Sequence, residues 1–438
     1  MRKTLSFFLL LIAFSINAQD FNKSKLDSLF SLIDDNHKGM GSISIFENSK
    51  EVYQNTIGYV SIEDSIKSNQ STKYRIGSIS KMFTASIILG LIEDQKLAMD
   101  TKLSEFYPDI INSEDITIEY LLRHRSGIYN FTNSSDYQSW MELPISKENL
   151  ITKIIDLGSS FKPNQRAEYS NSNYILLSFI AEYIEKKKFS KILKKRICKP
   201  CSLKDTYYGS KISTTNNEAL SYTKSNNWQI ATQTDMTILG GAGGVVSNST
   251  DLNKFLNCLF LGKLVSENSL TTMMQIQDGY GIGMFQVPFG NKKAFGHTGG
   301  VDGFQSNAFL FPTEEVSIAY TSNGVVMPIN DILIGVLSIY FSKDYELPVF
   351  TDTIRLKSEE LDKYLGVYSS LTFPLKITIT KEKNVLIAQA TGQPSFPLEA
   401  YEEHKFRFDQ AKLKIEFISQ ESTMILKQGG GQFTLKKE

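Results

Sequence analysis

The chain has 438 residues, of which 41% are hydrophobic, so it can bury a large core, and its length suggests one large domain with a smaller one. Forty-seven basic residues balance 47 acidic ones, so no strong overall field favours nucleic acid or an anionic membrane surface as a partner. We therefore expect an ordinary globular protein with no nucleic-acid partner.

The N-terminus has the pattern of a secretory signal peptide. Arg2 and Lys3 precede an apolar run over residues 5–16, and the small residue Ala18 follows. A membrane anchor is disfavoured because the run is too short for a comfortable span and no comparable stretch follows. No cysteine lies near the cleavage point, which argues against a lipoprotein anchor. We assign residues 1–18 to a signal peptide and expect a bacterial protein exported to the periplasm or secreted, without a stable membrane span after cleavage.

The first third of the mature chain alternates helix and strand patterns. Apolar residues at helical spacing predict an amphipathic helix over residues 21–35. A hairpin should follow, with strands over residues 41–46 and 52–57 and a polar turn between them. Residues 82–97 then predict a strongly apolar helix.

The middle third is predicted to be mostly helices and loops, and strand patterns return after it. The expected helices cover residues 116–122, 148–156, 173–187 and 251–260. The expected strands cover residues 294–298, 305–311 and 316–321, and a closing amphipathic helix covers residues 330–341. Together with the first third, these elements form one large predicted domain over residues 19–345.

Beyond about Glu346 the sequence changes to short β runs with polar turns. We predict a separate small β domain over residues 355–438. The expected strands are residues 375–380, 385–390, 405–408, 412–418 and 423–427.

Three cysteines, Cys198, Cys201 and Cys258, cannot give a fully paired disulfide framework, so stability must come mainly from the core. Cys198 and Cys201 have the spacing of a redox motif, but they follow a basic helix-like run and lack the strand-to-helix context of a thioredoxin site. A structural or incidental pair is the favoured interpretation, and whether the two are bonded stays open.

The four histidines show no metal-ligand spacing with each other or with the cysteines. They are His37, His124, His297 and His404. We predict neither a metal nor another cofactor.

A candidate nucleophile lies at Ser78, in the run Ser78-Ile79-Ser80-Lys81. It follows Gly77 and precedes the apolar helix, so it should lie near a helix N-terminus, where the backbone dipole favours developing negative charge. Lys81 is three residues on and shares the same helical face. Partial burial can lower a lysine pKa enough for it to take the serine proton. A capping serine with a solvated lysine is the alternative.

A second run, Tyr169-Ser170-Asn171, precedes another apolar helix. It can project a phenol and an amide from a loop into a cleft. Tyr169 beside a lysine can relay a proton toward the leaving group, while Asn171 orients Lys81 or the substrate carbonyl. The alternative is a structural turn ahead of the helix.

A third run is His297-Thr298-Gly299-Gly300. Gly299 and Gly300 remove side chains where a substrate must lie along a strand edge, and His297 and Thr298 are expected to line the pocket. A backbone N–H from this run, paired with that of Ser78, can stabilise a tetrahedral oxyanion. A glycine-rich β bend with a satisfied histidine is the alternative.

Each run is weak alone, because similar runs recur elsewhere in the chain. They are Ser159-Ser160-Phe161-Lys162, Ser221-Tyr222-Thr223-Lys224 and Tyr53-Gln54-Asn55. The order and local context of the three runs make the signal strong.

In that order the runs resemble those of the serine β-lactamase and penicillin-binding-protein-like hydrolases, close to class C β-lactamases, DD-carboxypeptidases and related esterases. The resemblance covers roughly residues 26–341. Supporting stretches are Tyr74-Arg75-Ile76-Gly77, residues 121–128 and residues 240–247.

The resemblance implies Ser78 as the acyl-forming nucleophile, Lys81 as its activating partner, Tyr169 as proton carrier and Asn171 as a positioning residue. Gly300 would supply the second oxyanion amide beside that of Ser78. The implied fold is α/β (α+β): an antiparallel sheet flanked by helices, beside a helical subdomain, with the site between them. The C-terminal β domain resembles the lipocalin-like domains often appended to these hydrolases.

One departure concerns His297. Many β-lactamases carry a lysine there, whose fixed charge helps to bind the drug carboxylate, whereas histidine is largely neutral at pH 7. The sequence therefore favours an exported serine hydrolase that acts through a Ser78 acyl-enzyme on D-amino-acid peptides, esters or amides, like a DD-carboxypeptidase or esterase. A β-lactamase or penicillin-binding protein is the alternative within the same chemistry, and a catalytically inactive binding protein is the alternative of another class. The natural substrate, a small molecule or peptide, and the oligomeric state stay open.

Overall fold

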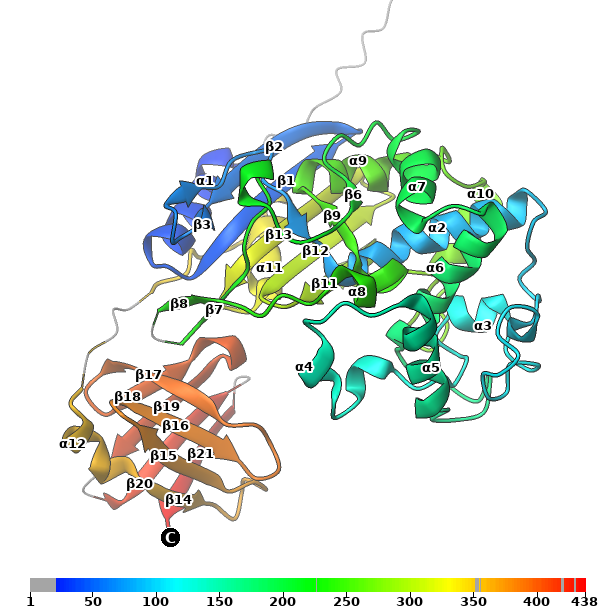
Figure 1. Cartoon of the computed structure of the whole chain (residues 1–438). Helices are drawn as coiled ribbons and strands as arrows, with labels where there is room; N and C mark the ends of the chain where they lie inside the picture. The colour runs from blue at the N-terminus through cyan, green and yellow to red at the C-terminus, as the bar shows by residue number, and fades with distance from the viewer. Residues whose placement is uncertain (1–20, 226, 351–353, 355, 419–420, 429–430) are drawn as a thin grey trace, which may run out of the picture.

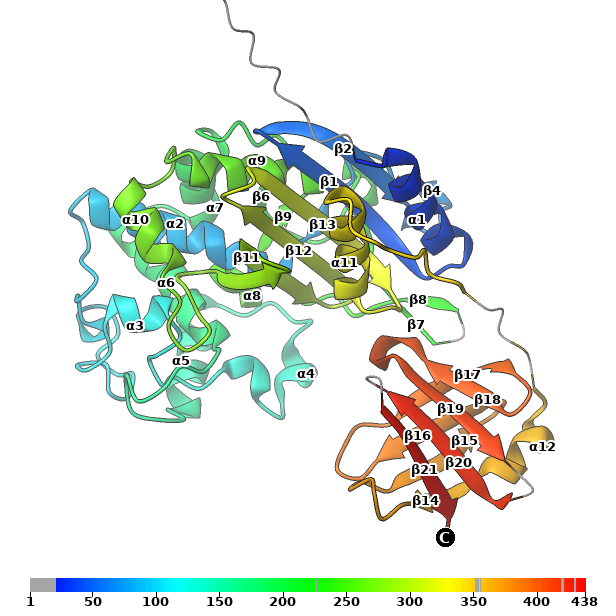
Figure 2. The same ribbon diagram turned by 180° about the vertical axis from the view of Figure 1, so that it is seen from behind.

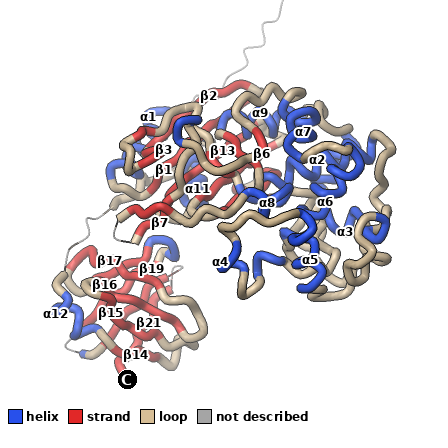
Figure 3. Tube along the Cα trace, in the orientation of Figure 1, coloured by secondary structure: helices blue, strands red, loops and turns tan. Residues whose placement is uncertain are grey.

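The computed structural model describes residues 21–438 except 226, 351–353, 355, 419–420 and 429–430. The predicted signal peptide, residues 1–18, lies outside the described residues. Figure 1 shows a large α/β part and a small C-terminal β part joined by a single connection. Figure 3 shows that helices gather at one end of the large part, whereas the small part is almost all strand.

The large part is built around a six-stranded antiparallel sheet with the strand order β10-β11-β12-β13-β1-β2. The first strand of the chain, β1, pairs with β13. The predicted N-terminal hairpin therefore joins the same sheet as strands β10 to β13, which lie far along the sequence. The strands are β1 (Gly39–Glu47), β2 (Lys50–Ile57), β10 (Phe285–Phe289), β11 (Lys292–Val301), β12 (Phe304–Phe311) and β13 (Val316–Val325).

Helices cover both faces of this sheet. α1 (Lys23–Asp35) and α11 (Ile329–Tyr340) contact each other and share one apolar cluster with the strands, and Figure 2 shows α11 lying across that face. α9 (Ser249–Phe260) packs on β1, β12 and β13 from the other side. β1 and β13 are buried along nearly their whole length because both their faces are covered.

A helical layer lies beyond α9, and α2 (Ser80–Glu93) is its centre. Eleven of its 14 residues are buried, as expected for a helix that is apolar on every side. It packs between α6 (Asn171–Glu185) and α8 (Met236–Gly243).

The other helices are α3 (Ile118–Leu122), α4 (Tyr137–Trp140), α5 (Lys147–Leu157), α7 (Phe189–Leu193) and α10 (Glu267–Met274). Short strands complete this part: β3 (Tyr59–Ser61), β4 (Ile66–Lys67), β5 (Tyr74–Arg75), β6 (Tyr207–Tyr208), β7 (Tyr222–Lys224), β8 (Trp228–Ile230) and β9 (Val245–Ser247).

The C-terminal part is a closed eight-stranded antiparallel barrel preceded by the short helix α12 (Ser358–Leu361). β14 pairs with both β15 and β21, which closes the ring. Side chains such as Leu386, Met424 and Leu435 are fully buried inside it. The strands are β14 (Gly366–Ser369), β15 (Ile377–Glu382), β16 (Val385–Ala390), β17 (Phe396–Glu402), β18 (Lys405–Phe408), β19 (Leu413–Ile418), β20 (Thr423–Gln428) and β21 (Gly431–Lys437).

The fold confirms the predicted class, an antiparallel sheet flanked by helices with a helical subdomain and a small all-β part. The short strands β3 to β9 were not predicted, and four strands of the main sheet and the barrel were also missed: β10, β14, β17 and β21. β10 contains Pro288 and β17 contains Pro397, and proline weakens a strand pattern because it donates no ladder hydrogen bond. Pro288 is tolerated because β10 is an edge strand. None of the helices in the described part of the chain is long and apolar enough to cross a membrane.

The cysteines do not pair by their sequence spacing. A disulfide joins Cys201 to Cys258 on α9, whereas Cys198 keeps a buried thiol that donates to the carbonyl oxygen of Thr206. Cys201 therefore ties the segment after α7 to the helix that covers the sheet.

Removing this disulfide should destabilise the large part. The bond closes a loop of 57 residues, for which chain entropy predicts a loss of at most about 4 kcal/mol in the free energy of unfolding. The measurement is urea unfolding of Cys201→Ala/Cys258→Ala, with Cys198→Ala as the control that removes a buried sulfur without opening a loop. A double variant as stable as the control would contradict the expectation.

Candidate active site

The structure brings the first two candidate runs together around the hydroxyl of Ser78. Ser78 lies in a 3-10 turn (Gly77–Ile79) that leads directly into α2, so Lys81 stands one turn further along the same face. The Ser78 Oγ lies 3.0 Å from the Lys81 Nζ and accepts a hydrogen bond of 2.7 Å from the Tyr169 hydroxyl. Nucleophile, amine and phenol are thus in direct contact.

The Lys81 side chain is completely buried. Its Nζ also lies 2.8 Å from the Asn171 Oδ1 and 2.8 Å from the carbonyl oxygen of Ala242. Burial holds the pKa of Lys81 well below its usual value, because a charged amine is costly away from water. A neutral amine has two N–H donors for Asn171 and Ala242 and one lone pair left for the Ser78 O–H. The surroundings therefore suit an amine that accepts a proton from Ser78.

Tyr169 has the opposite tendency. Burial raises the pKa of its hydroxyl above the usual range, so the phenol keeps its proton and donates to Ser78. Its ring centroid lies 4.8 Å from the Lys81 Nζ. A neutral amine and a protonated phenol on one serine oxygen form a base and an acid pair.

Asn171 is the first residue of α6 and is held from three sides. Its Oδ1 faces Lys81, its Nδ2 donates to the Thr132 Oγ1 at 3.0 Å, and its backbone N–H donates to the Asn130 Oδ1 at 2.9 Å. These partners fix which end of the amide faces the amine. The structure thus places Asn171 as a partner of Lys81.

Ala242 was not singled out by sequence reasoning, although its stretch, residues 240–247, was. Gly241 packs so tightly that a Cβ there would come within 2.6 Å of both Ser178 and Thr84. This close packing of α8 on α2 and α6 brings the Ala242 carbonyl to Lys81. A carbonyl partner leaves no side-chain signal in a sequence.

The third run lies on β11 and presses its backbone against the turn that carries Ser78. A Cβ on Gly299 would lie 1.9 Å from the Ile76 carbonyl oxygen, and one on Gly77 would lie 2.7 Å from the Gly300 nitrogen. Gly77 also has a φ of +52°, which favours glycine. The glycines therefore allow the backbone amide of Gly300 to approach the start of α2, as an oxyanion site requires.

His297 and Thr298 occupy opposite faces of β11 because side chains alternate along a strand. Thr298 is exposed and lines the cleft, as predicted. His297 is buried, with its ring 4.3 Å from that of Phe285 and 6.3 Å from that of Tyr169, so it lies beside the candidate catalytic tyrosine. Its Nδ1 donates to the Thr298 carbonyl oxygen at 2.5 Å. Burial lowers the pKa of His297 to about 3, so the ring is neutral.

His124 is a positioning residue that sequence reasoning missed. Its carbonyl oxygen accepts from the Glu168 N–H at 2.9 Å and its Nδ1 accepts from the Ser170 N–H at 3.2 Å, so it holds the backbone on both sides of Tyr169. Its ring centroid lies 4.6 Å from that of Tyr169. Burial lowers the pKa of His124, which keeps the Nδ1 lone pair available. A single histidine near the end of a helix does not indicate in the sequence that it forms these hydrogen bonds.

Two neighbouring hollows share Gly300, Val301 and Asp302, and Ser78 lines the smaller one. One of about 230 Å³ has apolar walls from Phe131, Tyr137, Met141, Ile238 and Leu239. The other, of about 630 Å³, follows β11 and β12 to the start of α11. Of the residues that line the two, only Asp302 is charged. Its buried carboxylate is paired with Arg75 at 3.2 Å and accepts from Thr234. No lining residue therefore offers a free positive charge.

Comparison with known families identifies this arrangement. The family model described as Beta-lactamase matches residues 29–332, about two thirds of the chain. The chain belongs to the beta-lactamase family. It is a serine hydrolase, and the matched residues include Ser78 and its contacts Lys81, Tyr169, Asn171 and Ala242.

Two relatives are similar to this chain over most of their own length. Penicillin-binding protein 4* of Bacillus subtilis (strain 168) is 23% identical over 426 residues, which cover 90% of this chain and 94% of that protein. Teichoic acid D-alanine hydrolase of Staphylococcus aureus is 25% identical over 310 residues, 65% of this chain and 74% of that protein.

Solved structures share the fold. The octameric penicillin-binding protein homologue from Pyrococcus abyssi has a TM-score of 0.67 at 24% identity, covering 94% of this chain and 99% of that one. D-amino acid amidase from Ochrobactrum anthropi SV3, complexed with D-phenylalanine, has a TM-score of 0.64 at 21% identity, covering 73% of this chain and 99% of that one. The predicted family resemblance is confirmed.

Activity should depend on pH through Lys81. The neutral amine is the reactive form, so kcat/KM for an ester should fall tenfold per pH unit below the Lys81 pKa in the free enzyme and level off above it. Lys81→Arg, whose guanidinium stays protonated, should be slower by several orders of magnitude throughout. A pH–rate profile of both proteins checks this. An active Arg variant, or a profile without an acid limb, would contradict the role of the amine.

Two substitutions of His124 should show whether kcat depends on a hydrogen-bond acceptor at the position of its Nδ1 or only on the size of the side chain. Asparagine places its Oδ1 where the His124 Nδ1 lies and tolerates the φ of +58° found there, so His124→Asn should keep most of the kcat. His124→Gln moves the acceptor one bond further and should lower kcat roughly 10- to 100-fold by displacing Tyr169. Steady-state kinetics with melting temperatures provides the readout. Equal kcat values in two equally stable variants would argue against the role of His124 in positioning Tyr169.

Proposed function

We propose that this protein is an exported hydrolase that forms an acyl-enzyme on Ser78 from esters and amides, including D-amino-acid derivatives, whose leaving group is uncharged. The observation that carries the proposal is the contact of the Ser78 hydroxyl with both a buried amine, whose pKa burial lowers, and a buried phenol, whose pKa burial raises. Export rests on the signal-like pattern of residues 1–18.

Acylation follows from these contacts. As the Ser78 Oγ bonds to the substrate carbonyl carbon, its proton passes to the Lys81 amine. The carbonyl oxygen becomes an oxyanion that the backbone N–H groups of Ser78 and Gly300 stabilise. Tyr169 gives its proton to the leaving oxygen or nitrogen as that bond breaks and regains one from the Lys81 ammonium. Asn171 and the Ala242 carbonyl hold the amine throughout.

Deacylation repeats these steps with water. A water molecule replaces the leaving group, gives its proton through Tyr169 to Lys81 as it attacks the acyl carbon, and the regenerated Ser78 Oγ takes a proton back. The enzyme returns to its starting protonation, and the net reaction is hydrolysis.

The preference for an uncharged leaving group rests on the charges of the site. A carboxylate next to the scissile bond would meet no free cation among the lining residues, and the buried ring of His297 is neutral. The apolar hollow beside Ser78 suits a compact acyl side chain. The names of two relatives, a teichoic acid D-alanine hydrolase and a D-amino acid amidase, agree with a D-amino-acid acyl group.

A second candidate function is penicillin binding or DD-carboxypeptidase activity. The similarity to Penicillin-binding protein 4* over 90% of this chain favours it. Its substrates carry a carboxylate on the leaving side or beside it, which the absence of a free lining cation disfavours. A catalytically inactive binding protein is disfavoured by the intact contacts of Ser78, Lys81 and Tyr169.

Two matched esters distinguish these functions. We expect the 3-carbamoylphenyl ester of N-acetyl-D-alanine to have a kcat/KM at least tenfold higher than the 3-carboxyphenyl ester. Each kcat/KM is first divided by the second-order rate constant for hydrolysis of that ester by hydroxide, which removes the difference in intrinsic reactivity. Such a ratio is about 1.4 kcal/mol of transition-state binding. Ser78→Ala should hydrolyse neither ester.

The outcomes separate cleanly. A preference for the carboxylate ester would favour the carboxypeptidase function while keeping the Ser78 chemistry. Turnover that survives in Ser78→Ala, or no turnover of any ester or amide by the natural enzyme, would contradict the acyl-enzyme proposal itself.

A further inference from the structure

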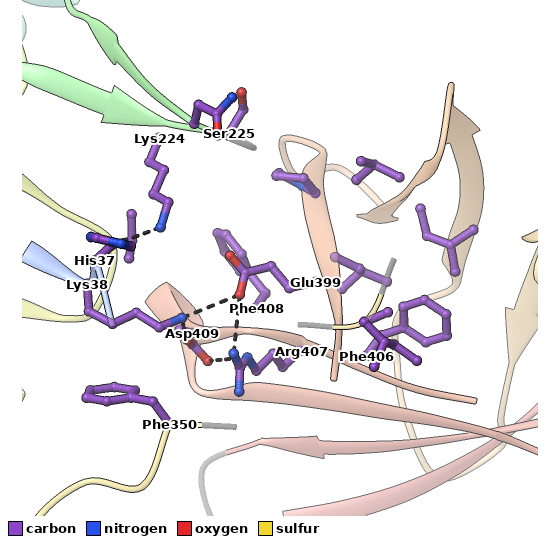
Figure 4. Close-up of a pocket in the computed structure, with 18 of the residues that line it drawn as sticks. His37, Lys38, Lys224, Ser225, Phe350, Glu399, Phe406, Arg407, Phe408 and Asp409 are labelled. Atoms are coloured by element: carbon purple, nitrogen blue, oxygen red, sulfur yellow. Dashed lines mark hydrogen bonds and ion pairs between the residues drawn. The ribbon is translucent and has the colours of Figure 1, made fainter. Parts of the chain in front are cut away.

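A second cavity lies away from Ser78, between the large part and the barrel. Its volume is about 590 Å³. Its walls come from the turn between α1 and β1, from the β7–β8 hairpin and from barrel strands β16, β17 and β18 (Figure 4). None of the residues that line the two hollows of the candidate active site lines this cavity.

One side of the cavity is closed by four charged side chains that balance each other. The ammonium of Lys38 lies 2.9 Å from Asp409 and 3.5 Å from Glu399, and Arg407 lies 3.4 and 3.5 Å from the same two carboxylates (Figure 4). Lys38 belongs to the large part and the other three to the barrel. Two cations and two anions satisfy one another, so this group holds the two parts together and leaves no net charge.

Lys224 is the other cation of the cavity. It extends from the end of β7, and its Nζ donates to the His37 carbonyl oxygen at 2.9 Å (Figure 4). Among the described residues no carboxylate lies within ion-pair distance of this ammonium, which has three donors. Burial and the charge of Lys38 lower the pKa of Lys224, and Glu399 and Asp409 offset this only in part. The remaining charged lining residue, Asp35, is exposed.

The barrel side of the cavity is apolar. Phe408 and Ala400 are partly exposed there, and Leu386, Leu398 and Phe406 are buried behind them. The Phe408 ring stacks on Phe396 with centroids 4.5 Å apart, which holds it in place. A cation with no carboxylate within ion-pair distance among the described residues thus shares with this apolar wall a hollow large enough for a small molecule.

We propose that this cavity binds a small organic anion with an apolar body, with the anionic group on Lys224 and the body against Phe408 and Ala400. Charge complementarity selects the anion, because the four-residue group is already neutral and Lys224 is not paired with it. The apolar wall selects the body, because it lies on the barrel side opposite the cation. The site is independent of the Ser78 chemistry.

The test uses the full chain and 8-anilinonaphthalene-1-sulfonate, an anion with an apolar body whose fluorescence rises on binding. We expect saturable binding at one site, at least tenfold weaker in Lys224→Met, which keeps the side-chain length but removes the charge. Lys224→Arg should retain binding. Lys211→Met, at an exposed lysine outside the cavity, is the matched control and should bind as the natural protein does.

A neutral probe and a second variant complete the design. N-phenyl-1-naphthylamine, which lacks the sulfonate, should bind at least tenfold more weakly than the anion and should not distinguish Lys224→Met from the natural protein. Phe408→Ala should weaken both probes. Melting temperatures identify any variant that fails to fold. No saturable binding of the anion, equal binding by Lys224→Met, or equal affinity for the neutral probe would each overturn the proposal.

Discussion

The burial of one lysine amine is the constraint on which the catalytic site depends. Lys81 rises from the helix that forms the centre of the helical layer, and its Nζ is surrounded by three neutral oxygens, those of Ser78, Asn171 and Ala242. Among the described residues no carboxylate pairs with it. A buried ammonium without a counter-charge is costly, so the amine is pushed toward its neutral form. The same burial keeps the phenol of Tyr169 protonated.

This constraint acts through the fold as a whole, since the site is assembled from four separate segments. α2 supplies Lys81, the start of α6 supplies Asn171, the kinked α8 supplies the Ala242 carbonyl, and β11 brings Gly300 to the Ser78 turn. Each depends on close backbone packing that larger side chains would prevent. His124 adds the last support by holding the backbone on both sides of Tyr169.

The reactive side chains of the site could be predicted from the sequence, whereas the groups that position them could not. Ser78, Lys81, Tyr169 and Asn171 were predictable because reactive side chains in a fixed order carry a signal. The Ala242 carbonyl carries none, because a backbone oxygen is the same in every residue.

The burial of His297 between Phe285 and Tyr169 depends on how β11 meets the Ser78 turn, which no local pattern shows. In the fold, strands with clear apolar alternation were predictable within a few residues. β10 and β17 were not, since each carries a proline that only its neighbours in the sheet make acceptable. Likewise the Cys201–Cys258 bond follows from the contact of distant segments, not from spacing.

The central claim is that Ser78 carries the acyl group during turnover, and peptide mapping of acid-quenched enzyme tests it most directly. Protein mixed with p-nitrophenyl acetate, stopped in acid within the first turnovers and digested, should show one acetyl group on the peptide that contains Ser78. The adduct should disappear as substrate is exhausted. Turnover with the acetyl group on another residue, or with no covalent adduct at any time of quenching, would contradict the account.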